Sequence, residues 1–184
     1  MNKLAIALSA ALSLGAAASA HAADATITFT GKVVASTCSV DIGGGGSTGA
    51  VALRQINAGA FKTDDTVGST PFTITLTAAG SGTATCSKNN ARLYVDAAAS
   101  NLTADGMIDN TVGTDPTSAV VKLLDADNGD RVIDLSDSND ASLVRPKASS
   151  KFEYNLIARY HNPTAVDLTE GDFSGKLAFD VDNY

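Results

Sequence analysis

Few residues of this chain have the types and spacing that catalysis or metal binding requires. The sequence contains two cysteines, Cys38 and Cys86, and two histidines, His21 and His161. His21 lies in a removable leader, so a Ser-His-Asp or Cys-His centre would depend on His161 alone, and a site with several histidine ligands is excluded. Acidic residues are plentiful, but no paired carboxylate motif stands out. The sequence therefore predicts no catalytic residue, no metal site and no cofactor.

The acidic segment at residues 125–130 is the one stretch with some likeness to a calcium loop. Asp125, Asp127 and Asp130 have suitable side chains, but Gly129 falls one place early for an EF-hand and Ser136 stands where a glutamate is needed. Asn128-Gly129 between two apolar runs instead favours a β-hairpin with a type I′ turn. The glycines at residues 43–46 lack a following Lys-Ser/Thr and a helix, and predict a loop between strands.

The first 22 residues have the features of a secretory signal. Lys3 precedes an apolar stretch too short for a comfortable membrane span, and Ala20-His21-Ala22 is the form that signal peptidase cleaves. The mature chain is thus predicted to be exported as one domain of ordinary size. In an oxidising compartment Cys38 and Cys86 are expected to form a disulfide that stabilises the fold by roughly 4 kcal/mol, the alternatives being two free thiols or half of a metal site.

The charge and composition restrict the partners. The chain has 13 Lys and Arg residues against 20 Asp and Glu, and loss of the leader removes the positive charge of Lys3. Phosphate backbones would repel such a chain, so nucleic acid is a poor partner. Aromatic residues make up 5% and tryptophan is absent, which argues against a large aromatic binding cleft, while 44% hydrophobic residues suffice for a packed core.

Apolar and polar residues alternate along most of the mature chain, which is typical of half-buried β-strands. No window predicts a convincing helix, because Gly, Ser and Thr interrupt the alanine-rich stretches. In the longest alternating run, residues 152–161, only Ile157 breaks the pattern. Strands are predicted at residues 27–33, 38–42, 51–56, 72–78, 92–97, 119–124, 131–135, 152–161 and 176–182. The fold class is accordingly all-β, an antiparallel sandwich of immunoglobulin-like size.

Several of these segments, in this order, resemble the pilin subunits of chaperone-usher fimbriae of the type 1 and P-pilus kind. The likeness covers nearly the whole mature chain. It consists of the leader, Phe-x-Gly-x-Val-Val at residues 29–34, the first cysteine Cys38, the strand at residues 71–76 before the second cysteine Cys86, Val-Lys-Leu-Leu-Asp at residues 121–125 and Ala-Arg-Tyr at residues 158–160.

The resemblance implies an incomplete immunoglobulin-like sandwich, completed by a donor strand from a neighbouring subunit. Its implied parts are a signal peptide (1–22), an N-terminal donor-strand extension (23–36) and a pilin domain (37–184). A periplasmic chaperone would first lend a strand, and the extension of the next subunit would replace it at an outer-membrane usher, building a cell-surface fimbrium. By position, the groove-filling residues of the donor strand are Ile27, Phe29, Gly31 and Val33.

The C-terminus departs from the family pattern. Pilins of this kind usually end with a penultimate tyrosine, whereas here Tyr184 is last. Leu177, Phe179 and Val181 are expected in the groove wall and the chaperone-contacting C-terminal strand, to which Tyr184 is assigned less firmly. The resemblance favours a structural subunit of an adhesive fimbria, a major, minor or adaptor pilin. The alternative is a stand-alone secreted or periplasmic β-sandwich that binds a carbohydrate or protein, in which residues 27–33 would be an internal edge strand.

Overall fold

The computed structural model describes residues 38–61, 64–78, 86–164 and 166–184. The predicted signal peptide and extension, including the predicted strand at residues 27–33 and the donor residues Ile27, Phe29, Gly31 and Val33, lie outside this part. Within it, eight strands form two antiparallel sheets, and the only α-helix is the four-residue α1 (Ala58–Phe61). No helix among the described residues is long and apolar enough to cross a membrane.

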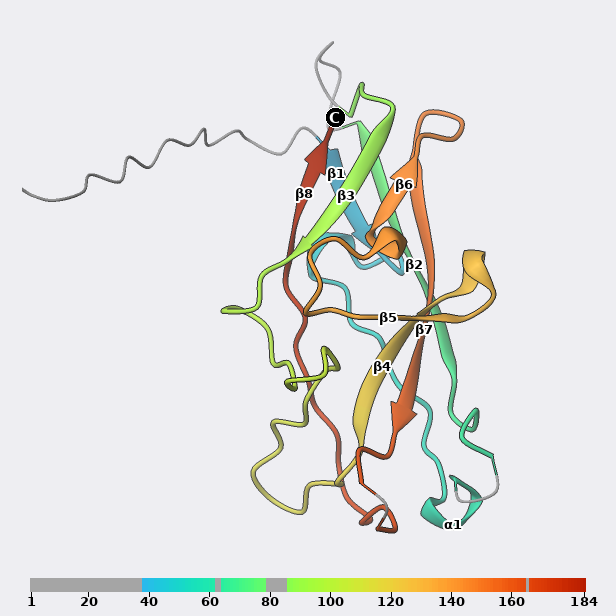
Figure 1. Cartoon of the computed structure of the whole chain (residues 1–184), viewed down its shortest axis with the longest axis vertical. Coiled ribbons are helices and arrows are strands. Elements are labelled where there is room, and N and C mark those ends of the chain that lie inside the picture. The colour runs from blue at the N-terminus through green and yellow to red at the C-terminus, as the bar shows by residue number, and fades with distance from the viewer. Residues whose placement is uncertain (1–37, 62–63, 79–85, 165) are drawn as a thin grey trace, which may run out of the picture. The chain divides into compact units, whose positions relative to one another are not determined.

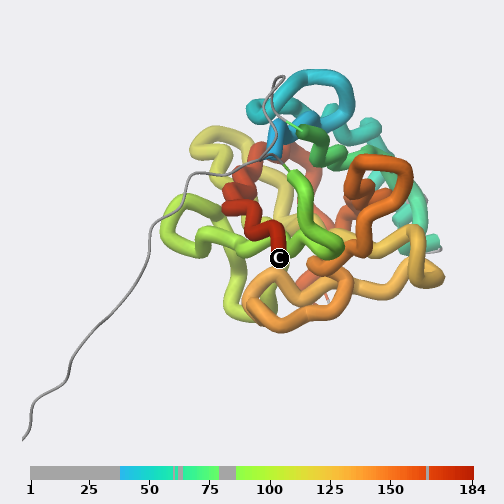
Figure 2. Tube along the Cα trace, turned by 90° about the horizontal axis from the view of Figure 1, so that it is seen from above, coloured from blue at the N-terminus to red at the C-terminus, as the bar shows by residue number. Residues whose placement is uncertain are grey.

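The larger sheet has the strand order β1-β2-β7-β4-β5 and the smaller one the order β6-β3-β8, as Figure 1 shows. The larger sheet consists of β1 (Cys38–Ile42), β2 (Thr70–Ala78), β7 (Phe152–His161), β4 (Val120–Asp125) and β5 (Arg131–Ile133). The smaller sheet consists of β6 (Val144–Pro146), β3 (Asn90–Val95) and β8 (Phe179–Asn183). Seen from above in Figure 2, long loops surround the strands.

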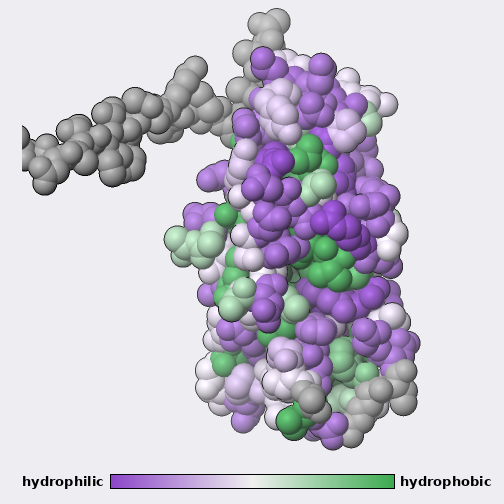
Figure 3. All heavy atoms as spheres, in the orientation of Figure 1, coloured by the Kyte–Doolittle hydropathy of each residue, from purple (hydrophilic) through white to green (hydrophobic). Residues whose placement is uncertain are grey.

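The core lies between the sheets and follows the period-two pattern of the sequence. Phe152, Tyr154, Leu156 and Ala158 on β7 are all buried, and Ile74 and Leu76 on β2 pack with them. On the face of Figure 3, by contrast, the surface is largely hydrophilic with separate, small apolar patches.

Ile157 breaks the alternation of β7 because the outer face of the larger sheet carries a second, smaller apolar contact. Ile157 pairs in register with Leu124 of β4 and Pro71 of β2. Leu124 is itself buried although it faces away from the main core. The irregular residue thus adds to the outer surface of the sheet and leaves the strand intact.

Three polar or covalent contacts join the sheets. The predicted disulfide between Cys38 on β1 and Cys86 just before β3 is present, with a Cα–Cα distance of 4.8 Å. The Tyr154 hydroxyl donates to the Ala91 carbonyl oxygen at 2.9 Å, and burial raises the pKa of this phenol. Arg145 on β6 forms an ion pair with Asp125 on β4.

Two expectations about local structure were wrong. The β4–β5 hairpin exists, but its turn is not type I′. Asp125 pairs with Arg131, a 3-10 turn (Ala126–Asn128) follows β4, and the left-handed residues are Gly129 (φ 63°) and Asp130 (φ 58°). The Asp125 carboxylate accepts a hydrogen bond from the Asp127 N–H at 3.2 Å, which stabilises the longer turn.

The second wrong expectation is the strand at residues 51–56. Its first four residues, 51–54, alternate between half-buried and exposed, as in a strand, but the segment is not paired with any strand of the described part. Alternation sets which side chains face inward, whereas a strand also needs a neighbour that accepts its backbone hydrogen bonds. Most of this unpaired segment lines the groove of the candidate functional site.

Candidate functional site: an unpaired sheet edge and its groove

The C-terminal segment from Asp172 to Tyr184 is hydrogen-bonded along one side. Its even-numbered residues bond to residues 90–117: Asp172 O accepts from Thr117 N–H at 3.0 Å, Lys176 O accepts from Asn101 N–H at 2.8 Å, and Tyr184 exchanges two bonds with Asn90 at 3.0 Å. In β8 itself, Leu93 lies opposite Val181 and Val95 opposite Phe179. The whole segment is therefore extended and fixed from one flank.

The opposite flank carries the N–H and C=O groups of the odd-numbered residues. In an antiparallel ladder these groups point away from β3 when those of the even-numbered residues point toward it. Among the described residues, no strand pairs with this edge of β8. The odd-numbered side chains point inward, and the apolar ones that pack against the core are Phe173, Leu177, Phe179 and Val181. This edge thus offers free backbone groups beside apolar side chains.

A groove of about 810 Å³ runs along this edge. Its second wall is the unpaired segment at residues 49–55, where Val51 and Leu53 turn their side chains inward. Its floor comes from the central strands of the larger sheet. The floor residues are Phe72, Ile74, Val121, Leu123, Ala158 and Tyr160. The groove therefore lies where a further strand would fit, between the edge of the C-terminal segment and residues 49–55.

The residues predicted for the groove wall are placed as follows. Leu177 and Phe179 line the groove, whereas Val181 lies on the same edge and packs against the core without lining it. Tyr184 extends the backbone ladder through Asn90, and its side chain is 49% exposed. Their contact with a chaperone stays a prediction.

Sequence reasoning missed the earlier part of this wall. Phe173 and Gly175 line the groove, and Phe173 packs edge-on against Tyr160 with ring centroids 5.9 Å apart. The alternation of Phe173, Gly175 and Leu177 continues that of the terminal strand and was the available signal. Ile108, another lining residue, lies outside the named strands in an isolated β-bridge with Val121 and had no signal in the sequence.

The acidic residues of the β4–β5 hairpin form ion pairs with arginines. Asp125 contacts Arg145 at 2.5 Å, Asp127 lies 3.5 Å from Arg145, and Asp130 lies 3.6 Å from Arg159. The described residues include no group of three or more Asp, Glu, His or Cys side chains that could hold a metal ion.

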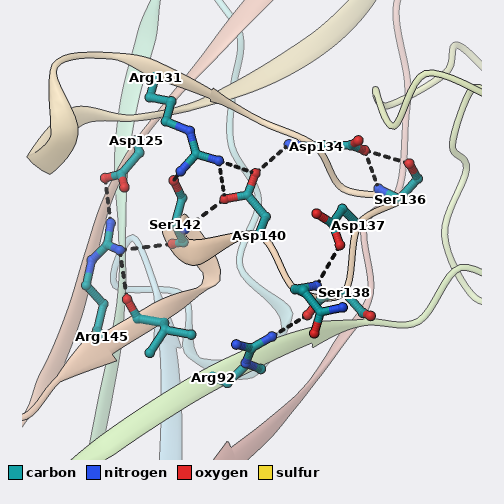
Figure 4. Close-up of polar contacts among 12 residues, drawn as sticks. Arg92, Asp125, Arg131, Asp134, Ser136, Asp137, Ser138, Asp140, Ser142 and Arg145 are labelled. Carbon is teal, nitrogen blue, oxygen red and sulfur yellow. Dashed lines mark hydrogen bonds and ion pairs between the residues drawn. The ribbon is translucent and has the colours of Figure 1, made fainter.

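A second set of polar contacts fixes the loop after β5 (Figure 4). Arg131 makes a bidentate pair with Asp140 at 2.9 Å, and Asp140 also accepts from Ser142 N–H at 2.8 Å and Asp134 N–H at 3.1 Å. Burial works against ionisation of Asp140, but these donors and the Arg131 charge outweigh it, so its pKa lies below the ordinary value. The cluster contributes to stability and lies outside the groove.

Comparison with known proteins finds one matching family and similar solved structures. The model of the fimbrial protein family matches residues 27–183. A subunit from a structure describing rod uncoiling in a chaperone-usher pilus is 18% identical, with a TM-score of 0.53 over 87% of this chain and 95% of that chain. The P pilus rod subunit PapA is 14% identical, with a TM-score of 0.44 over 87% of this chain and 99% of its own. No curated protein matches the sequence.

Proposed function

Because this chain belongs to the fimbrial protein family and is a structural subunit of a pilus, not an enzyme, we propose that its groove accepts the N-terminal extension of another subunit. The protein is exported to the cell surface, where it assembles with other subunits. In the proposed mechanism, residues 23–36 are the donor strand that each subunit gives to its neighbour, and residues 37–184 form the accepting pilin domain.

The observation that carries this proposal is the free edge from Phe173 to Val181 beside the groove. A strand laid there gains backbone hydrogen bonds from the odd-numbered residues and buries alternate side chains against the groove floor. The extension has the matching pattern, with Ile27, Phe29 and Val33 on one face. Each such side chain contributes about 1.5 to 3 kcal/mol when it is buried.

The positions of the chain ends favour an antiparallel donor strand. Tyr184 is bonded to Asn90, and the disulfide holds Cys38 next to Cys86, so β8 ends at the same end of the domain at which β1 begins. A donor strand antiparallel to β8 then ends at the opposite end of the acceptor domain, so the domain of the donor subunit lies beyond that end. Subunits can therefore follow one another in a line, whereas a parallel donor strand would bring the equivalent ends of the donor and acceptor domains together.

An empty groove with a free sheet edge would promote aggregation during export. We therefore assign periplasmic transit to a complex in which a chaperone lends the missing strand, followed by exchange for the next extension at an outer-membrane usher. Residues 1–22 serve as the signal peptide in this scheme. The chaperone would contact the strand that contains Leu177, Phe179 and Val181 and ends at Tyr184.

The proposal is tested by a chain that fills its own groove. Residues 24–35 are appended after Tyr184 through a short flexible linker, and the original extension is deleted. An antiparallel strand begins where β8 ends, so a short linker suffices, and tethering raises the effective donor concentration into the millimolar range. We expect a soluble, heat-resistant monomer that needs no chaperone.

The matched control carries the same appended segment with Phe29→Asp in that copy. This control should melt at the same low temperature as the chain whose extension is merely deleted. If the unsubstituted appended chain is no more stable than the deleted chain, the donor-strand mechanism is wrong, and a stand-alone sandwich becomes the better description.

A further inference from the structure

We propose that Asn110 is a positioning residue of the accepting groove: its side-chain amide fixes the wall at residues 172–174 and thereby holds the Phe173 ring in place before a strand arrives. This inference rests on the proposed donor-strand function. It adds a residue that is not among those lining the groove, yet determines how readily the groove accepts a strand.

The groove wall is not held by a strand along its whole length. The ladder between β3 and β8 covers residues 179–183 of the C-terminal segment. At Asp172 and Ser174 the segment bonds instead to residues 109–117, which belong to no named strand. The Ser174 N–H donates to the side-chain oxygen of Asn110 at 3.0 Å, where a neighbouring strand would offer a backbone carbonyl. A side chain therefore completes the ladder at this end of the wall.

The Asn110 amide uses all of its hydrogen-bonding positions. Its Nδ2 donates to the carbonyl oxygens of Thr117 at 2.9 Å and Asp172 at 2.8 Å. Its Oδ1 accepts from the N–H groups of Val112 at 3.1 Å and Ser174 at 3.0 Å. Two carbonyl oxygens on one side and two N–H groups on the other fix the orientation of the amide. A carboxylate or a hydroxyl at this position cannot make the same four bonds.

The residues just before Asn110 are attached to the floor of the groove. Ile108 exchanges two backbone hydrogen bonds with Val121 of β4, at 2.8 and 2.9 Å, and both residues line the groove. Two positions later, Asn110 is bonded to the wall. The short run at residues 108–110 therefore holds the floor and the wall at a fixed spacing at this end.

The bonds of Asn110 to the wall lie on either side of Phe173. Because side chains alternate along an extended segment, fixing the backbone at Asp172 and Ser174 keeps the residue between them turned inward. The Phe173 ring then packs edge-on against Tyr160, with ring centroids 5.9 Å apart. A strand that enters a wall already in its final arrangement does not bear the cost of ordering it.

The inference is tested by the rate at which chaperone complexes of the full-length chain assemble into fibres, followed by light scattering. Asn110→Asp keeps the size of the side chain but sets an oxygen against the carbonyl oxygens of Thr117 and Asp172. We expect assembly to slow about 3- to 10-fold, as for the loss of one or two hydrogen bonds. The extension of this variant is unchanged, so the loss arises in the accepting groove.

The matched control is Asn162→Asp, the same substitution in a loop that does not line the groove. The Asn162 amide also bridges its loop: Nδ2 donates to the Val166 carbonyl oxygen at 2.8 Å, and Oδ1 accepts from the Thr164 N–H at 3.1 Å. This variant should assemble at the rate of the unsubstituted chain.

A double-mutant cycle distinguishes positioning from a general loss of stability. Phe173→Ala removes the ring through which Asn110 acts. In that background Asn110→Asp should slow assembly by less than about 2-fold further, whereas independent effects would multiply. If Asn110→Asp yields too little complex to measure, Asn110→Ser, which keeps one donor, takes its place in the cycle.

Three results would overturn the role of Asn110 and leave the donor-strand function standing. They are assembly of the Asn110 variant at the unsubstituted rate, equal slowing by Asn162→Asp, and an undiminished effect of the Asn110 substitution after Phe173→Ala. Fibres that form equally well from a chain without residues 23–36 would instead overturn the proposed function.

Discussion

Two residue-level contacts, the disulfide and the ion pair of Asp140 with Arg131, connect separate parts of the sandwich. Both are expected to stabilise the folded state of the incomplete domain. The disulfide joins β1 of the larger sheet to the start of the smaller sheet. The Asp140 carboxylate, whose side chain is 3% exposed, joins β5 to the loop before β6 through Arg131 and two backbone donors. A domain that lacks a strand has little stability to spare, so single contacts of this kind have large effects.

Removal of the disulfide should abolish accumulation of the subunit. The variant Cys38→Ser with Cys86→Ser loses roughly 4 kcal/mol on the chain-entropy estimate, which is comparable to the whole stability of a small domain. The measurement is the amount of subunit in the periplasmic fraction and in isolated fibres. Fibres at the level of the unsubstituted chain would show that the bond is dispensable.

Asp140 should contribute to stability only above its own pKa. Because the folded-state pKa is depressed, the contribution is complete above the unfolded value of about 3.9 and is lost as the pH falls through the folded value. Asp140→Asn should lower the free energy of unfolding by about 1 to 3 kcal/mol near pH 7. The difference should shrink below pH 4 in denaturant titrations of the appended-donor monomer.

The control for this titration is Thr114→Ser, since Thr114 is exposed, uncharged and makes none of the contacts of the cluster. This variant should match the unsubstituted chain at every pH. A constant difference for Asp140→Asn between pH 7 and pH 3 would mean that the residue acts through packing and not through its charge.

At the scale of elements, the groove lies between one segment that is hydrogen-bonded along a single flank and another that pairs with no strand of the described part. The segment from Asp172 to Tyr184 is fixed by residues 90–117, whereas the wall at residues 49–55 has inward side chains but no ladder. The donor strand is expected to supply bonds to both. We therefore expect the backbone pairing of the two walls to change differently when the groove is filled.

Hydrogen exchange should show the wall at residues 51–56 becoming a strand. We expect its donor-facing amides to exchange roughly 100-fold or more slowly in the appended-donor monomer than in the chain whose extension is deleted. The amide of Lys147 donates to the Asn89 carbonyl oxygen at 2.8 Å, on the flank of the smaller sheet away from β8, and serves as the internal reference. Equal exchange of residues 51–56 in the two chains would show that this wall does not pair with the donor.

A charge on the donor face should block assembly and spare the fold. Phe29→Asp would place a carboxylate in an apolar groove at a cost of several kcal/mol. The variant should still be captured by its chaperone, since its own groove is unchanged, but should not donate to a neighbour. Pull-down with the chaperone and electron microscopy of fibres measure the two effects, and loss of capture would place Phe29 in the subunit's own core.

At the scale of the whole molecule, giving and accepting a strand are separate activities of one chain. The proposed donor residues precede β1 in the sequence, and the groove runs beside β8 on the folded domain. A chain that lacks residues 23–36 should thus accept a strand without being able to give one. Added to assembling subunits, it should shorten fibres in proportion to its share, as measured by electron microscopy.

The control is the same amount of full-length chain, which should leave fibre length unchanged. Incorporation of the truncated chain without shortening would show that subunits also join by contacts other than the extension. This outcome would limit the donor-strand mechanism to part of the assembly.

The sequence by itself determined which residues face inward and which cysteines pair. Period-two alternation predicted β2 and β7 almost to their ends, because burial of every second side chain is a local property of an extended chain. The likeness to pilins placed Leu177, Phe179 and Val181 in the wall of a groove, and of these Leu177 and Phe179 line the groove beside β8. The likeness to pilins added the missing strand, which no local pattern can reveal.

Only the tertiary structure decided which segments have partners. Residues 51–54 alternate between half-buried and exposed as a strand does, yet β1 pairs with β2 and residues 51–56 pair with no described strand. The lining of the groove likewise includes Ile108, which is 69 positions before Leu177 in the sequence and forms an isolated β-bridge with Val121. Alternation is a property of one segment, whereas a ladder and a groove form only where two or more segments come together. The residues of a single segment do not determine which other segment comes to lie beside it.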